Sequence, residues 1–125
     1  MRQVIVYNKS DPQVKPIRVV YCSSFFCRLR GLTFRSHLSP DEGLLLVQPR
    51  DSRLDTAVHM VGVWLDLAVV WINSAGIVVD SCLARRWRLA YVPRRPARFV
   101  LEMAPVHLPD FKVGDEVRFE EKPLD

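Results

Sequence analysis

The 125-residue sequence has few cysteines, few glycines and no long apolar run. Its three cysteines, Cys22, Cys27 and Cys82, form no CxxC pair, so the spacing predicts neither a disulfide scaffold nor a zinc ribbon. The five glycines are widely scattered, which excludes a glycine-rich phosphate-binding loop. The longest apolar run, Leu67 to Ile72, is far below the ~20 residues that a membrane-spanning helix requires.

The N-terminal residues also lack the apolar core of a signal peptide. After Val4-Ile5-Val6-Tyr7 the sequence turns polar at Asn8, too soon for such a core. With neither a leader nor a membrane span, and with an odd number of cysteines, the sequence predicts a cytoplasmic, reduced protein.

What is present is typical of one globular domain. Hydrophobic residues make up 49% of the chain and charged residues 26%, which argues against disorder. No linker or repeat interrupts the sequence, so we expect a single domain over residues 1–125. The 18 basic residues, mostly arginines, outnumber the 14 acidic ones and give a net charge of +4, which permits an anionic partner without requiring one.

Short β-branched and aromatic runs separated by turn residues predict about eight strands, at 4–7, 17–22, 44–47, 57–61, 63–72, 77–83, 99–103 and 116–119. Pro49 is expected to end the third of these strands. Ser23 and Ser24 are suited to cap one short helix. Phe25, Phe26, Leu29 and Leu32 recur after them at helical spacing, and Gly31 is suited to the left-handed end of a helix. The predicted class is mainly β, a single-domain β-sandwich or barrel of jelly-roll type with one short helix.

Several phrases occur together in a family-specific order. They are Arg28 to Arg35, Asp41-Glu42-Gly43-Leu44, Leu65-Asp66 before Val69-Val70-Trp71-Ile72, Ala75-Gly76-Ile77-Val78, Val100-Leu101-Glu102 and Val113-Gly114-Asp115. Over about residues 15–120 the chain resembles the domain-of-unknown-function 192 family, also called UPF0127. The resemblance implies a compact, jelly-roll-like β fold and supplies no activity. The chain departs from the family pattern at Thr33, where the family has Met.

The most conspicuous motif is an arginine-rich segment. Six arginines are interleaved with two aromatic residues: Arg85, Arg86, Trp87, Arg88, Tyr91, Arg94, Arg95 and Arg98. Arginines that contact phosphates and rings that stack on bases would suit single-stranded nucleic acid, while guanidinium groups could equally bind an acidic sugar or an acidic protein. The alternative is a solvated loop whose arginines pair with nearby carboxylates and whose rings anchor it on the core.

A second candidate set centres on Asp66, which interrupts an otherwise apolar segment. A carboxylate at such a position must be paired, hydrogen-bonded or exposed, because burying it alone is costly. Arg30 or Arg35 could pair with Asp66 and clamp the predicted helix to the sheet. Alternatively, Asp66 could form the floor of a polar pocket together with His59 and Glu102.

Other catalytic or metal-binding arrangements have little support. Nothing near Cys27 in the sequence would activate it as a nucleophile, so we expect it to behave as a small hydrophobic residue. His37, His59 and His107 are isolated, which does not suggest a metal site, and no cofactor is indicated. Three hypotheses follow: a non-enzymatic module that binds an anionic partner through the arginine-rich segment, a hydrolase-like enzyme using His59, Asp66 and Glu102, and an accessory module without a ligand. The oligomeric state stays open.

Overall fold

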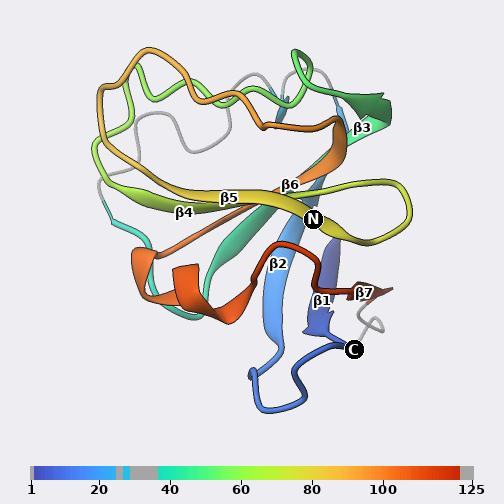
Figure 1. Cartoon of the computed structure of the whole chain (residues 1–125). Coiled ribbons are helices and arrows are strands. Elements are labelled where there is room, and N and C mark those ends of the chain that lie inside the picture. Colours follow the sequence, from blue (N-terminus) through green and yellow to red (C-terminus); the bar gives the residue numbers. More distant parts are fainter. Residues whose placement is uncertain (1, 25–26, 29–36, 122–125) are drawn as a thin grey trace.

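The computed structural model describes residues 2–24, 27–28 and 37–121, and within them the protein is built on one seven-stranded sheet (Figure 1). The strands are β1 (Gln3–Asn8), β2 (Ile17–Cys22), β3 (Gly43–Ser52), β4 (Leu67–Ile72), β5 (Val78–Ala84), β6 (Ala97–Met103) and β7 (Val117–Glu121). A 3-10 helix, η1 (Pro105–Asp110), precedes the last strand. The prediction of a mainly β fold is confirmed, and the sheet is curled into a half-barrel.

The strand order is β5-β4-β6-β3-β2-β1-β7, and β2 and β3 form the only parallel pair among the described strands. Gly43 begins β3 at a place where backbones lie close together. A Cβ atom there would approach Val19 Cγ1 to 2.7 Å and the Glu102 carbonyl oxygen to 3.2 Å, so a side chain would push the strands apart. The edge strands meet at one corner through a bridge between Ile77 and Glu116, which completes the curl.

Apolar residues fill both faces of the sheet. One cluster takes members from all seven strands, among them Val6, Leu45, Val70 and Leu101, so it occupies the inside of the curl. The other cluster lies on the outer face of β3, β4, β5 and β6 and includes Trp71, with Met60, Val63 and Leu65 covering it from a loop. Since β4 is buried at every residue, it has the continuous apolar sequence expected of a central strand.

Three details of the predicted strands are wrong. β3 continues past Pro49 to Ser52, because a shift in register between Val47 and Ser52 takes the proline out of the regular ladder. The predicted strand over 57–61 is reduced to one bridge at Val58, and the next begins only at Leu67. The chain turns between them at Gly62, whose φ of 79° is open to glycine but unfavourable for other residues.

Candidate binding surface

The arginine-rich segment lies beside the loop that precedes β4. We call residues 53–66 and 85–96 together the paired loops; they run along one side of the sheet, at the top of Figure 1. Val58 and Tyr91 exchange backbone hydrogen bonds of 2.8 and 2.7 Å. Met60 donates its N–H to the Arg88 carbonyl oxygen and accepts one from Trp87 N–H. These bonds give the arginine-rich segment a defined backbone conformation.

Trp87 is held in an unusual conformation at the exposed end of this arrangement. Its φ of 65° is the only positive value outside glycine in the described residues. A bulky residue in this region is strained, and such strain persists only where surrounding contacts enforce it. About half of Trp87 remains exposed, and its ring meets the Trp64 ring edge-to-face with centroids 5.0 Å apart. The loops therefore present two adjacent indole rings to solvent.

Asp66 helps to hold the backbone beside Trp87 in its strained conformation. Its Oδ1 accepts hydrogen bonds from the backbone N–H of Arg86 (2.9 Å) and from Arg86 Nε (3.2 Å), and Arg85 Nη1 lies 3.9 Å from Oδ2. The backbone hydrogen bond from Arg86 is the largest effect on the pKa of Asp66 and lowers it. Burial raises this pKa by less, and the guanidinium groups of Arg86 and Arg85 lower it further, so the pKa lies below its usual value. Asp66 thus clamps the start of β4 to the arginine-rich segment; Arg30 and Arg35, suggested by the sequence, lie outside the described residues.

The remaining arginines of the segment divide into two groups. Arg98 is half-buried and donates from Nε to the Gln48 carbonyl oxygen at 2.9 Å. Arg88, Arg94 and Arg95 are exposed, and in the described part of the chain no carboxylate forms an ion pair with their guanidinium groups. Three cations of the arginine-rich segment are therefore available to an external partner, and Arg88 directly follows Trp87 in the chain.

The three residues of the predicted polar pocket form no hydrogen bond with one another in the described part of the chain. His59 is exposed, Asp66 binds Arg86, and Glu102 is 4% exposed on β6. Glu102 pairs with Leu44 and Val69 across the sheet, so it shares their outer apolar face. Burial raises the pKa of Glu102 to about 7. Among the described residues no hydrogen bond links any two of the three, so the geometry gives no acid–base pair.

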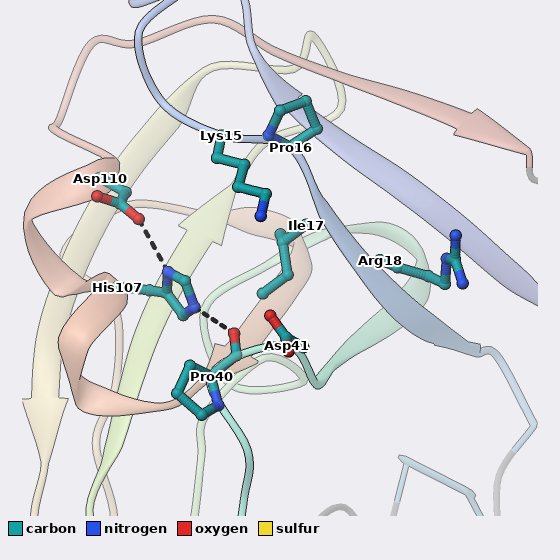
Figure 2. A pocket seen from close by; sticks show the side chains of 8 residues that line it. All are labelled: Lys15, Pro16, Ile17, Arg18, Pro40, Asp41, His107 and Asp110. Carbon is teal, nitrogen blue, oxygen red and sulfur yellow. Dashed lines mark hydrogen bonds and ion pairs between the residues drawn. The ribbon is translucent and has the colours of Figure 1, made fainter.

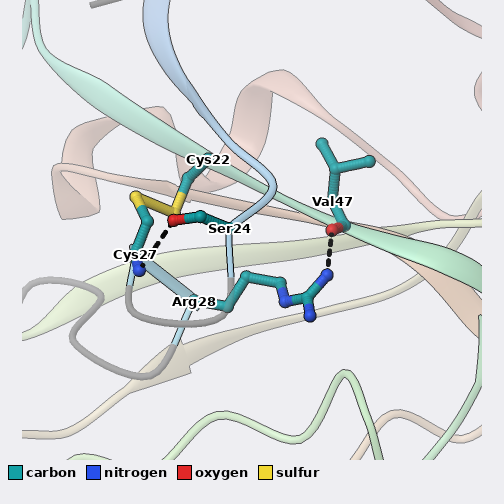
Figure 3. Close-up of a disulfide and its surroundings, with 5 residues drawn as sticks. All are labelled: Cys22, Ser24, Cys27, Arg28 and Val47. Carbon is teal, nitrogen blue, oxygen red and sulfur yellow. Dashed lines mark hydrogen bonds between the residues drawn. A yellow bond between two sulfur atoms is a disulfide. The ribbon is translucent and has the colours of Figure 1, made fainter.

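The prediction of a reduced protein is wrong for two of the three cysteines. Cys22, at the end of β2, forms a disulfide with Cys27 (Figure 3). Ser24 Oγ accepts the Cys27 N–H at 3.2 Å, as predicted for a capping serine, and Arg28 N–H bonds to the Ser24 carbonyl oxygen. The remainder of the predicted helix lies outside the described residues. No CxxC pair marks this disulfide in the sequence, because the turn after β2 brings together two cysteines that are five residues apart.

A separate hollow of about 230 Å³ lies between the β1–β2 connection and η1 (Figure 2). His107 stands in its wall, with Nδ1 bonded to Asp110 Oδ2 at 2.9 Å and Nε2 bonded to the Pro40 carbonyl oxygen. His107 thereby ties η1 to the segment that leads into β3.

Two further observations bear on partners. Within residues 2–24, 27–28 and 37–121, no three His, Cys, Asp or Glu side chains are grouped as a metal site would need. Over the same residues, no helix has the length and apolar content to cross a bilayer.

The fold and the surface define a small half-barrel β protein with one basic, aromatic side. The profile of the family DUF192, described as "Uncharacterized ACR", matches residues 6–119, and the chain belongs to this family. It is 36% identical over 104 residues to a UPF0127 protein of Thermococcus gammatolerans, covering 83% of this chain and 65% of that protein, just under two thirds of its length. A UPF0127 protein of Thermococcus sibiricus is 32% identical, with 93% of this chain and 75% of that protein covered.

A solved structure supports the fold. The chain matches the crystal structure of "a putative transcription regulator" from Sinorhizobium meliloti 1021 with a TM-score of 0.79 and 20% identity, covering 94% of this chain and 92% of that one. At this identity the likeness shows the fold alone.

One residue of the surface was not predicted from the sequence. Trp64 lies outside the arginine-rich segment and meets Trp87 only because the two loops pair. Trp64 stands between Val63 and Leu65, which are both buried, so alternation along this segment would place Trp64 on the exposed side.

Proposed function

We propose that this protein is a non-enzymatic binding module whose paired loops hold an anionic partner. The observation that supports it best is Trp87, kept half-exposed in a strained conformation by contacts from Met60 and Asp66. A loop that only covered the core would not need such a conformation. A loop built to present a ring would, because pre-organisation lowers the entropy lost on binding.

The charge distribution favours an anion. Arg88, Arg94 and Arg95 belong to the same loop as Trp87 and form no ion pair with a carboxylate in the described residues. A planar guanidinium group can donate two parallel hydrogen bonds to a phosphate or carboxylate. Asp66 offsets only Arg85 and Arg86, through pairs whose arginine side chains are mostly exposed. Such exposed pairs contribute about 0–1 kcal/mol, so an anionic ligand could compete for both arginines.

Binding should be tested with a labelled single-stranded oligonucleotide, polygalacturonate and polyglutamate at low salt. A triple variant, Arg88→Gln/Arg94→Gln/Arg95→Gln, should weaken binding by at least about tenfold, and added salt should weaken it further. A matched control removes three exposed cations elsewhere: Lys15→Gln/Arg18→Gln/Lys112→Gln.

The outcomes separate the possibilities. Binding that is lost in the loop variant and retained in the control supports the proposal. Loss in the control alone would move the anion site to the hollow of Figure 2, which Lys15 and Arg18 line. If neither these polyanions nor anionic lipid vesicles bind, the proposal fails and the accessory-module hypothesis gains weight.

The cytoplasmic location expected from the sequence remains a prediction. The Cys22–Cys27 disulfide bears on it, because disulfides persist mainly in oxidising compartments. The redox state of these two cysteines in protein taken directly from its cells would test the location.

A further inference from the structure

Large exposed apolar side chains are concentrated in the paired loops. Eight are exposed among the described residues, and six belong to the paired loops: Leu54, Val61, Trp64, Trp87, Leu89 and Val92. Leu54 and Leu89 are 81% and 82% exposed, more than any other large apolar residue in that group. Soluble proteins scatter such residues singly, whereas a concentration of them marks a docking surface.

The aliphatic members say what kind of partner this surface fits. Flat bases would occupy the rings of Trp64 and Trp87, but they offer little to Leu54 and Leu89. Burying a leucine side chain away from water stabilises by about 1.5–3 kcal/mol, which a hydrocarbon environment supplies. Tryptophan concentrates where hydrocarbon meets the polar headgroups of a bilayer, because its ring is apolar and its N–H is polar.

The charges on the surface complement one particular bilayer. Arg88 and Leu89 are adjacent, and Arg94 and Arg95 follow Val92 closely, so cations alternate with apolar side chains along one loop. Lipid phosphates would receive the guanidinium groups at the level where the apolar side chains enter the interface. A surface with arginines beside exposed leucines therefore matches anionic lipid better than neutral lipid.

Building on the proposed function, we propose that the paired loops dock the protein onto the surface of an anionic lipid bilayer. Leu54, Leu89 and the two indole rings enter the interfacial layer, while Arg88, Arg94 and Arg95 bind headgroup phosphates. The attachment is peripheral and reversible, since it depends on a few side chains and on charges that salt screens.

The test uses the full chain and lipid vesicles. Vesicles of equal parts phosphatidylglycerol and phosphatidylcholine are compared with phosphatidylcholine alone, and binding is followed by co-sedimentation and by tryptophan emission. Trp71 is 1% exposed, so changes in emission and quenching by brominated lipid tails report on Trp64 and Trp87. We expect binding to the anionic vesicles, a blue shift, and quenching by the brominated tails.

Variants distinguish insertion of the paired loops into the bilayer from nonspecific hydrophobic adsorption. Leu54→Ser/Leu89→Ser should weaken vesicle binding by roughly tenfold or more, because two apolar side chains no longer leave water. The matched control is Val106→Ser/Val113→Ser, which changes exposed valines at 65% and 61% exposure outside the paired loops and should leave binding unchanged. Removal of each of Arg88, Arg94 and Arg95 should weaken binding about fivefold.

Each result has a distinct meaning. The inference is overturned if the protein binds vesicles but brominated tails do not quench its tryptophan emission. It is also overturned if Leu54→Ser/Leu89→Ser binds vesicles as well as the unmodified protein does. In both cases the proposal of anion binding still stands. Binding to the oligonucleotide or polyglutamate but not to vesicles does the same, and identifies nucleic acid or an acidic protein as the partner class. Absence of binding to every anion overturns both proposals. The quenching measurement on the unmodified chain stays decisive if a variant fails to fold.

Discussion

The stability of this protein should fall as Glu102 ionises. Glu102 lies on the apolar outer face of the sheet, in register with Leu44 and Val69, and burial raises its pKa from 4.5 to about 7. Between these two values the carboxyl group is ionised in the unfolded chain and protonated in the folded protein. The folded state binds more protons there, so the free energy of unfolding decreases as pH rises from about 4.5 to about 7 and levels off above.

The size of this effect follows from the shift in pKa. One pKa unit corresponds to about 1.4 kcal/mol, so a shift from 4.5 to about 7 predicts a loss of about 3 kcal/mol across the window. A Glu102→Gln variant keeps the shape of the neutral acid and cannot ionise. The free energy of unfolding of the variant minus that of the unmodified protein should therefore increase by about 3 kcal/mol over the same window.

The measurement is urea unfolding, followed by tryptophan fluorescence at several pH values from about 4 to about 9 for both proteins. Taking the difference between them removes the contribution of other titrating groups that the substitution leaves unchanged. A difference that stays constant with pH would show that Glu102 is solvated in the folded state. That result would refute the reasoning from burial.

Two other substitutions test contacts away from the paired loops. Replacing Cys22 and Cys27 by alanine should lower the free energy of unfolding by about 2 kcal/mol, the entropy of closing so short a loop, and unfolded unmodified protein should show Cys82 as its one free thiol until reduction exposes all three. Replacing His107 by alanine should cost roughly 1–3 kcal/mol in urea unfolding, because Asp110 and the Pro40 carbonyl oxygen lose their shared donor. Equal stability of either variant and the unmodified protein would contradict the corresponding contact.

Much of the sheet was predictable because its strands carry local signals. Ile17–Cys22 was predicted with its observed bounds. The break between the strands predicted at 63–72 and 77–83 coincides with a turn in which Asn73 Oδ1 accepts backbone hydrogen bonds from Ala75 and Ile77. Pro49 was wrongly predicted to end its strand, because whether a proline ends a strand depends on the register with the partner strand. The segment 57–61 misled the prediction for a similar reason: its apolar residues cover the sheet from outside and never join it.

The candidate site was predictable in part. The arginine-rich segment and the special position of Asp66 are visible in the sequence, because charge clusters and an isolated carboxylate need no knowledge of tertiary contacts. Two features were not predictable: the arginine that pairs with Asp66, and the contact between Trp64 and Trp87. Both depend on two loops that lie about twenty residues apart in the chain. Such pairings arise from sheet geometry, which no local pattern encodes.

The arginine-rich segment combines structural and available cations in a definite order. Its first two arginines pair with Asp66 and fix the turn at Trp87, and its last, Arg98, binds the Gln48 carbonyl oxygen at the start of β6. Between these anchored ends lie Arg88, Arg94 and Arg95, together with Leu89 and Val92, all exposed. A segment kept only for solubility would have no reason to anchor its ends and expose apolar side chains between them. Anchoring at both ends instead limits the conformations of the middle, which is what a binding loop gains from pre-organisation.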